Sequence, residues 1–449
     1  MNHSFIISIL LFISLLCPVK GGASVMFHHY GVESGLSQST AYTILQDRVG
    51  FIWIGTKSGL NRFDGTSFKV YRASKQQGCL GRDYVTVLYE DVNGDIWVGT
   101  DAGVWIYHPQ TNTFSRFDVH SSNGTMVTGY VNVIKGLGSK IYIAANEQGV
   151  FCYDLHSKAM TNHCLPKLPN VSGMGFARNG RLWLGLYGGG LYNADHALRQ
   201  LIPFKTNDGK IPFAGDVVSS IVEMPNGKLF VGSEKHGLSE IDLRNKSLTS
   251  IVDKYNGKDI FVRAITVRKG IVLAATEMGL YVFNTRNNEL QHFMYQPYDA
   301  FSLSDNPLYS IYIDRDDALW TGSYFGGVNY LPPANIPFNR ILPQGEDGGA
   351  LPGRRVREMV QDKYGMIWIG TEDAGLCKLN PTTNEITTIP ASSTFPNVHG
   401  LYADGDYLWV GTFSYGLKVI DIRTGQVVKS FMPGDKSGDL RTSTIFCID

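Results

Sequence analysis

The residues of this chain that could contact a ligand gather in short inserts between two recurring glycine motifs, a Gly-Thr-like pair and a Gly-Leu pair. Along the chain these inserts read KS, DA, NEQ, YGG, EKH, EM, YFG, EDA and FSY. Aromatic rings there offer flat apolar faces on which sugar rings can stack. For each such ring, packing within its own loop is the alternative. The candidate ligand contacts of this kind are Tyr187, His236, Tyr324, Phe325, Phe413 and Tyr415.

A cluster of three arginines, Arg354, Arg355 and Arg357, lies in the segment GRRVRE. Guanidinium groups bind carboxylates and sulfates through two parallel hydrogen bonds, so this cluster could hold a sulfate or a uronate. A solvated or interdomain surface is the alternative interpretation. The whole chain carries 40 Lys and Arg against 40 Asp and Glu, without a basic stripe. We therefore expect this region to make no contact with nucleic acid.

Carboxylates and metal ligands give no comparable signal. A glycosidase needs an acid and a base at one site. The inserts contain Glu147, Glu234, Glu277, Glu372 and Asp373, but no two of them stand out as a pair. The cysteines lack the CxxC pairing or the His and Cys clusters of a metal site. The sequence predicts no catalytic residue, no metal and no cofactor.

Two cysteines, Cys152 and Cys164, flank a predicted hairpin. They could pair across it or remain as packed thiols. The sequence leaves both alternatives open, because a disulfide needs matched Cβ geometry.

The candidate residues are positioned by a repeat of about 45 residues, a period typical of β-propeller blades. Its copies include FIWIGTKSGLNRFDG, DIWVGTDAGVWIYHP and MIWIGTEDAGLCKLN. Each copy predicts four strands, with an Asp-Gly turn between the first two strands and the ligand inserts between the second and third. The aromatic position at the centre of each copy is held by Trp53, Trp97, Tyr142, Trp183, Phe230, Leu273 (the one aliphatic exception), Trp320, Trp368 and Trp409.

The nine copies predict an all-β chain with one complete ring and part of another. Residues 24–336 are expected to form a seven-bladed β-propeller, and residues 337–449 the first blades of a second, incomplete β-propeller. A segment rich in Pro and Gly, residues 331–352, interrupts the rhythm between them. Residues 27–30 match an outer strand without a blade of its own, so we expect them to complete a blade from the far end of a ring. The last residues, RTSTIFCID, match the opening strand of a tenth blade, and we expect the natural sequence to continue.

The N-terminus predicts export. An apolar run over residues 5–17 is followed by small residues at Gly21 and Ala23. This pattern is typical of a secretory signal peptide cleaved near Ala23, which gives residues 1–23 as the signal peptide. A lipoprotein signal ending at Cys17 is the alternative, although Leu16 is bulkier than such a signal prefers.

The opening repeat, ESGLSQSTAYTILQDRVGFIWIGTKSGLNRFDG, resembles the consensus of the two-component regulator propeller family. Members are periplasmic sensor regions of hybrid sensor kinases from Bacteroidota. In that family two seven-bladed propellers precede a small β-sandwich, a transmembrane helix, a histidine kinase, a receiver and often a DNA-binding domain. The resemblance implies phosphorelay signalling triggered by an oligosaccharide, with a homodimer of the full-length parent.

The resemblance also implies what this region lacks. None of the parts downstream of the propellers is found in this sequence, so we expect a periplasmic sensing module without enzyme activity, attached to a membrane only through a helix that lies further downstream. Two other functions stay open: a scaffold for protein partners, and a carbohydrate-active glycosidase or lyase. Binding of a glycan without turnover would separate the sensor from the enzyme.

Overall fold

The computed structural model describes residues 25–163, 170–333, 341, 351–383 and 385–448. The chain divides into two compact units, one of residues 25–335 and one that includes residues 336–449. The expected signal peptide, residues 1–23, lies outside the described residues. The expected boundary between residues 336 and 337 also lies outside them. The described residues form strands, turns and two short 3-10 helices, η1 (Val32–Ser34) and η2 (Pro390–Thr394), and include no α-helix.

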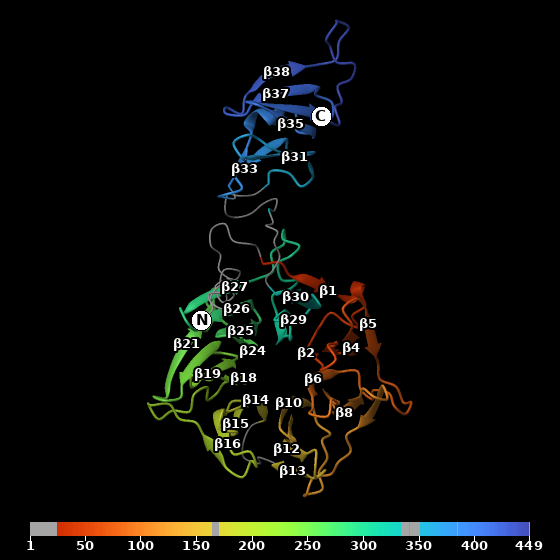
Figure 1. The fold of residues 1–449 in the computed structure, drawn as a ribbon. Helices are drawn as coiled ribbons and strands as arrows, with labels where there is room; N and C mark the ends of the chain where they lie inside the picture. Colours follow the sequence, from red (N-terminus) through yellow and green to blue (C-terminus); the bar gives the residue numbers. More distant parts are fainter. Residues whose placement is uncertain (1–24, 164–169, 334–340, 342–350, 384, 449) are drawn as a thin grey trace, which may run out of the picture. The chain divides into compact units, whose positions relative to one another are not determined.

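The unit of residues 25–335, hereafter the seven-sheet unit, contains seven four-stranded antiparallel sheets among its described residues, arranged around a common centre (Figure 1). Strands β2, β6, β10, β14, β18 and β24 lie innermost in that view. The strands of the seven sheets are β2(Thr43–Gln46), β3(Ile52–Thr56), β4(Gly59–Phe63), β5(Phe68–Tyr71); β6(Val85–Glu90), β7(Ile96–Thr100), β8(Gly103–His108), β9(Thr113–Arg116); β10(Val131–Leu137), β11(Lys140–Ala145), β12(Gly149–Asp154), β13(Met160–His163); β14(Val171–Phe176), β15(Leu182–Leu186), β16(Gly190–Ala194), β17(Leu201–Pro203); β18(Val218–Glu223), β19(Lys228–Ser233), β20(Leu238–Asp242), β21(Ser247–Val252); β24(Val262–Arg268), β25(Ile271–Thr276), β26(Gly279–Asn284), β27(Glu289–Phe293); and β28(Leu308–Ile313), β29(Leu319–Ser323), β30(Val328–Leu331), β1(His28–Tyr30). A small hairpin, β22(Lys254–Tyr255) and β23(Lys258–Asp259), lies between two of these sheets in the sequence.

The first strand of the chain closes the ring. Strand β1 pairs antiparallel with β30, with His29 opposite Asn329, and so supplies the outer strand of the last sheet. Phe27, just before β1, is 2% exposed, and its N–H donates to the carbonyl of Phe301. The prediction that residues 27–30 complete a blade from the far end of the ring is confirmed. The all-β propeller architecture expected from the repeat is confirmed with it.

The glycine of each Gly-Thr-like pair lets neighbouring sheets pack closely. A Cβ atom on Gly55, in β3, would lie 2.5 Å from a methyl carbon of Val85, in the next sheet. The same holds at Gly232, where the neighbouring methyl belongs to Val262. Any larger side chain there would push two sheets apart, because protein interiors pack without spare volume. These glycines therefore belong to the scaffold.

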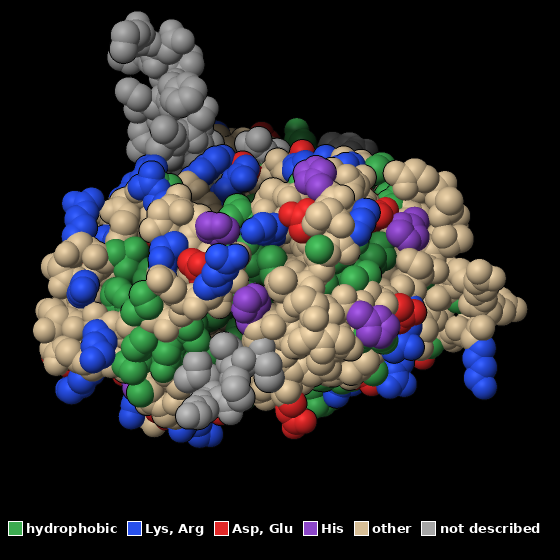
Figure 2. All heavy atoms as spheres, turned by 90° about the horizontal axis from the view of Figure 1, so that it is seen from below, with side chains coloured by type: hydrophobic (Ala, Val, Ile, Leu, Met, Phe, Trp, Pro, Cys, Tyr) green, Lys and Arg blue, Asp and Glu red, His purple; other side chains and the backbone are tan. Residues whose placement is uncertain are grey.

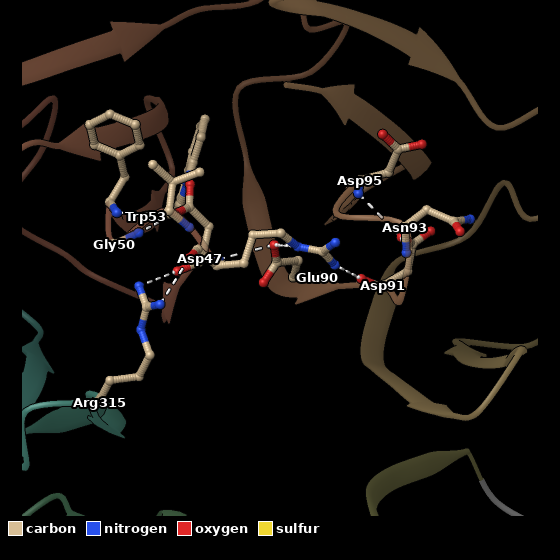
Figure 3. Close-up of polar contacts among 11 residues, drawn as sticks. Asp47, Gly50, Trp53, Glu90, Asp91, Asn93, Asp95 and Arg315 are labelled. Carbon is tan, nitrogen blue, oxygen red and sulfur yellow. Dashed lines mark hydrogen bonds and ion pairs between the residues drawn. The ribbon is translucent and has the colours of Figure 1, made fainter. Parts of the chain in front are cut away.

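The central tryptophan and the Asp-Gly turn act as one unit. One carboxylate oxygen of Asp47 accepts the N–H groups of Val49, Gly50 and Phe51, and the other accepts the indole N–H of Trp53 at 2.8 Å (Figure 3). Both side chains are almost fully buried. A carboxylate satisfied in this way fixes both the turn and the ring. The same indole-to-carboxylate bond joins Trp97 to Asp91, Trp320 to Asp314 and Trp368 to Asp362.

Where the turn lacks this aspartate, the tryptophan either donates its indole N–H to another residue or is less buried. Trp183 lies six residues after Ala177, and its indole N–H donates instead to Glu223 of the next sheet at 2.7 Å. Trp409 lies six residues after Ala403 and is only partly buried. An Asp six positions before a Trp therefore indicates this indole-to-carboxylate hydrogen bond, and the pattern can be recognised in the sequence.

Arginines at two of the turns tie three consecutive sheets of the ring together. Arg315, on the last sheet, donates to the carbonyls of Asp47 and Arg48 at 2.9 and 2.8 Å, on the first sheet (Figure 3). Arg48 in turn donates to the carboxylate of Glu90 at 2.8 Å and to the carbonyl of Asp91 at 2.6 Å. The Asp-Gly turns lie on one face of the ring, which we call the turn face. On this face, polar groups hold neighbouring sheets together.

Charge is dispersed over the side of the molecule that Figure 2 shows. Figure 2 shows one side of the molecule, on which lysine and arginine side chains are spread among acidic, histidine and apolar ones without forming a single patch. Equal totals of acidic and basic residues agree with this pattern. A charged ligand would have to be held by a local group of side chains.

The other unit, hereafter the two-sheet unit, has two four-stranded sheets among its described residues. The segment Thr444–Ile448 contacts the second of them: the side chain of Ile445 lies against Gly411, as that of Val398 lies against Gly370. This is the place that the first strand of a following sheet would take. The strands of the two sheets are β31(Val356–Gln361), β32(Ile367–Thr371), β33(Leu376–Leu379), β34(Ile386–Thr388) and β35(Val398–Asp404), β36(Tyr407–Thr412), β37(Leu417–Asp421), β38(Val427–Phe431).

The proposed disulfide partner of Cys152 lies outside the described residues. Cys152 is a buried free thiol in β12, and the register with β13 places Thr161 opposite it. Burial raises the pKa of the Cys152 thiol, which makes it a poor nucleophile. The structure therefore shows Cys152 as a packing residue of the sheet.

Candidate functional site

Five tyrosines form a continuous row on the face opposite the turns, near the inner ends of four sheets. Tyr324 stacks on Tyr309 with ring centroids 5.5 Å apart, Tyr309 lies 5.1 Å from Tyr42, Tyr42 lies 5.2 Å from Tyr84, and Tyr84 lies 5.8 Å from Tyr130. All five are partly exposed. We call this row the tyrosine arc. It runs from the last sheet of the ring across the closure to the first three sheets.

The residue type at one position of the repeat differs between the sheets, and this difference explains where the arc forms. In four neighbouring sheets the residue after the first buried residue of the inner strand is small and polar: Thr86, Asn132, Ser172 and Ser219. Each donates a side-chain hydrogen bond to a backbone carbonyl of the next inner strand, for example from Thr86 to Val131 at 2.7 Å. These bonds join the sheets around the centre.

In the three remaining sheets that position holds large side chains: Arg263, Tyr309 and Tyr42. These three sheets are consecutive in the ring, since the last sheet adjoins the first. At the closure the neighbouring residue Ser310 takes over the bond, donating to the carbonyl of Ala41 at 3.1 Å. The scaffold contact is thus kept, and the larger side chains gather on the face opposite the turns.

Two cations rest on the tyrosine rings. The ammonium of Lys57 lies 5.7 Å from the ring centroid of Tyr42 and 5.3 Å from that of Tyr84. The guanidinium of Arg263 lies 4.0 Å from the centroid of Tyr309. Arg263 also forms an ion pair with Glu277, whereas Lys57 has no ion-pair partner among the described residues. Contacts between cations and ring faces hold both groups in place at little cost in solvation.

Three tyrosines of the arc, Tyr42, Tyr130 and Tyr309, are neutral phenols at neutral pH. Burial raises the pKa of Tyr42 and Tyr130, and neighbouring tyrosine hydroxyls raise each further. Burial also raises the pKa of Tyr309, although Arg263 acts in the opposite direction. Their hydroxyls can therefore both donate and accept hydrogen bonds. The surface combines apolar ring faces, hydroxyls and one unpaired cation.

Three of the aromatic residues expected from the sequence lie in or beside the arc. Tyr324 is a member, and Phe325, 73% exposed, lies 4.2 Å from its ring centroid. Tyr187 is exposed and close enough to Tyr130 to raise its pKa. The inserts between Gly-Thr and Gly-Leu therefore contribute part of the candidate site.

His236 forms a separate group. Its Nδ1 lies 2.7 Å from a carboxylate oxygen of Asp216, and the Asp216 side chain is fully buried. The ring of Phe213 meets that of His236 edge-on. The carboxylate also accepts the backbone N–H groups of Val217 and Lys235. These contacts fix the loop, so His236 serves the scaffold on its Asp216 side and exposes its other edge.

The candidate arginines of the two-sheet unit are largely matched by acids. Arg357 forms an ion pair with Glu372 at 2.7 Å, and Arg355 a longer one with the same carboxylate at 3.4 Å. The backbone N–H of Arg354 donates to Asp373. A carboxylate already placed between two arginines competes with any bound anion, so this cluster is a weaker anion site than its sequence suggested.

The two aromatic candidates of that unit are exposed. Phe413 is 44% exposed and contacts the rings of His399 and Phe446. Tyr415 is 39% exposed, and its backbone N–H donates to Thr412. They lie in the loop between β36 and β37, the insert position of their repeat.

Sequence reasoning missed four members of the arc: Tyr42, Tyr84, Tyr130 and Tyr309. They lie at or just before the inner strands, outside the inserts. A signal was present at two of them, because Tyr42 and Tyr309 replace a small polar residue of the repeat. Among the described residues, no group of three or more His, Cys, Asp or Glu is placed to hold a metal ion.

Comparison with protein families supports the resemblance found in the repeat. Residues 35–58, 79–102 and 350–373 match the family model described as two component regulator propeller. The chain carries two-component regulator propeller repeats. Two of the three matched segments lie in the seven-sheet unit, and each spans the Gly-Thr pair of its repeat.

Solved structures share the fold of these propeller repeats. An extracellular domain assigned to a hybrid two-component system of B. thetaiotaomicron is 22% identical, with a TM-score of 0.66, and the match covers 91% of this chain and 61% of that one. A second extracellular domain from the same organism, assigned to a one-component system, is 18% identical with a TM-score of 0.59 and the same coverage. The chain therefore spans less than two thirds of either structure, and at these identities the match shows the fold.

A curated relative matches over a short stretch. Residues of this chain are 40% identical over 73 positions to the protein named Histidine kinase P4 of Formosa agariphila, which is 16% of this chain and 5% of that protein. In the part of the chain that the structure describes, no helix is long and apolar enough to cross a membrane.

Proposed function

We propose that this chain is the ligand-sensing propeller region of a periplasmic two-component signalling protein, and that its ligand is an oligosaccharide. The carrying observation is the run of two-component regulator propeller repeats. The fold shared with two extracellular domains assigned to signalling systems supports a place outside the cytoplasm. The exposed tyrosine rings support a carbohydrate ligand, because such rings combine an apolar face with a polar edge.

Signal output belongs to parts of the protein other than these repeats. The propeller region binds the ligand, and a membrane helix and kinase downstream carry the signal. We include a homodimer of the full-length parent in the proposal, since signalling across a membrane by one helix per chain needs a second chain to move against.

Isothermal titration of the purified full chain against a panel of oligosaccharides tests the function. Each sugar that releases heat is recovered and checked for cleavage by chromatography. We expect binding in the micromolar range without any product. Cleavage of a bound sugar would replace the sensor by a glycosidase or lyase, and heat from none of the sugars would overturn the carbohydrate ligand.

Export is tested separately. Residues 1–23, fused to an alkaline phosphatase that is active only outside the cytoplasm, should give phosphatase activity. A matched fusion with Leu10 and Leu11 changed to Arg should give none, because the apolar run is then interrupted. Activity equal in both fusions, or absent in both, would contradict the assignment of a signal peptide.

A further inference from the structure

The unpaired cation of the tyrosine arc points to the class of ligand. Lys57 follows Thr56 at the end of β3, and its exposed ammonium lies over two rings of the arc. Its backbone N–H donates to the side chain of Gln38 at 3.2 Å, which fixes the loop that carries it. Lysine side chains lose much conformational freedom when they bind a ligand. Here the tyrosine faces restrict that freedom beforehand.

The second cation, Arg263, lies over the next ring of the arc. Arg263 covers Tyr309, and Tyr309 lies against Tyr42, which Lys57 covers. Acids also lie along the arc: Glu277 pairs with Arg263, Asp101 pairs with Arg82 at 3.6 Å, and Asp305 accepts the backbone N–H of Phe325 at 2.8 Å. Within the described ranges, Lys57 has no ion-pair partner. A ligand with one acidic group at this place would meet an oriented ammonium and neutral phenol hydroxyls.

From this arrangement we propose that the tyrosine arc binds an acidic oligosaccharide, with a carboxylate or sulfate of one sugar held by Lys57 and neighbouring sugar rings lying against Tyr42 and Tyr84. The proposal rests on the proposed function, since it names the binding residues and the substrate class of the same sensor. A charge-assisted hydrogen bond from Lys57 supplies affinity for the acidic group. The exposed ring faces supply affinity for the sugar chain.

An independent observation favours this place over the rest of the ring. Four other sheets use the equivalent repeat position to bond the next sheet, as Ser172 does with Val218 at 2.7 Å. Tyr42 and Tyr309 occupy this position instead, and beside Tyr309 the neighbouring Ser310 makes the bond to Ala41. At Tyr309 the position is therefore free to carry a partly exposed aromatic ring.

The test compares two lysines that differ in their surroundings alone. Lys69 lies on the outer strand β5, away from the arc. Its ammonium lies 4.9 Å from the ring centroid of Tyr71 and donates a hydrogen bond to the side chain of Asn112. It matches the cation-on-tyrosine contact of Lys57. The full chain and the variants Lys57→Gln and Lys69→Gln are titrated against an array of neutral, uronic-acid and sulfated oligosaccharides, with circular dichroism to confirm folding.

We expect the oligosaccharides that bind the unaltered chain to be acidic, and their affinity to fall as salt is raised. Lys57→Gln should weaken binding about tenfold or more, the loss of one hydrogen bond to a charged group. Lys69→Gln should bind as the unaltered chain does. Tyr42→Ala should also weaken the binding of the acidic sugars, since it removes a stacking face.

Three outcomes would overturn the inference. Binding of oligosaccharides that Lys57→Gln leaves unchanged would place the site elsewhere while leaving the sensor function intact. Preference for neutral sugars would leave the function intact and reject the substrate class. Binding of none of the sugars by the unaltered chain would reject the sensor function and this inference together.

Discussion

The pairing of Asp47 with Trp53 predicts a specific cost for a nearly isosteric change. In Asp47→Asn one of the two oxygens becomes an NH2 group. If the remaining oxygen keeps the three N–H groups of the turn, the NH2 group faces the indole N–H at the 2.8 Å of the present bond. Two donors then meet in a site where the residue is 6% exposed. Losing this charge-assisted bond and leaving a buried donor unpaired should cost about 1.5–3 kcal/mol.

The assay is urea unfolding followed by circular dichroism, which reports on the strands whether or not a tryptophan is removed. The double variant Asp47→Asn with Trp53→Phe isolates the contact, because phenylalanine has no N–H to meet the amide. The change at Asp47 should cost clearly less in that background than alone. Asp64→Asn is the matched control: Asp64 accepts the N–H groups of Thr66 and Ser67 in an exposed turn and has no indole partner. Its effect should be much smaller.

An equal cost of Asp47→Asn with and without the indole N–H would refute this reasoning. The turn bonds alone would then explain the effect, and the spacing of Asp and Trp in the repeat would need another cause. A cost for Asp64→Asn as large as that for Asp47→Asn would lead to the same conclusion.

Three further predictions concern the ring. Gly55→Ala should cost about 1–3 kcal/mol in urea unfolding, and less in a background with Val85→Ala and Thr43→Ser, since the new methyl would meet the methyl groups of Val85 and Thr43 at 2.5 and 2.6 Å; an equal cost in both would contradict the close approach. Phe27→Ala should cost about 3–5 kcal/mol and make residues 25–30 sensitive to protease, since it loosens the closing strand; unchanged protease resistance would argue against that role. Burial lowers the pKa of His292, so the unfolded chain binds the proton at higher pH than the folded one, and stability should fall as pH drops below about 6.5. The urea midpoints of the unaltered chain and of His292→Gln are compared at pH 7.5 and 5.5. The variant should lose less stability at the lower pH, and an equal loss of stability would show that His292 is not the group responsible.

The repeat made the scaffold predictable. Each sheet is built by the same local signals, so the glycine that admits a neighbouring sheet and the turn before Trp53 could be recognised from their recurrence. Even the closing strand was predictable, since residues 27–30 match an outer strand for which the sequence offers no blade. The hydrogen-bond partner of most tryptophans could be recognised as the Asp six positions earlier. The Glu223 partner of Trp183 could not, because it comes from the next sheet.

The candidate site was only partly predictable, for a physical reason. Tyr309 and Tyr42 are far apart in the sequence, and only ring closure brings their rings to 5.1 Å. The inserts pointed to Tyr324 and Phe325 because variation there was visible in each copy. Tyr84 and Tyr130 lie just before inner strands, where an aromatic residue is indistinguishable from ordinary strand packing until the sheets are assembled.

The closure of the ring and the tyrosine arc share the same seam. Ala41 accepts a hydrogen bond from Ser310 and donates one to the carbonyl of Ser323, so the first and last sheets meet there through their backbones. Tyr42 and Tyr309 are the immediate neighbours of these two joined residues. A ligand held at the arc would lie beside this seam, which the closing strand and the Arg315 contacts also hold together. Because a ligand that binds the folded form stabilises it, occupation of the arc would reinforce the ring where its first and last sheets meet.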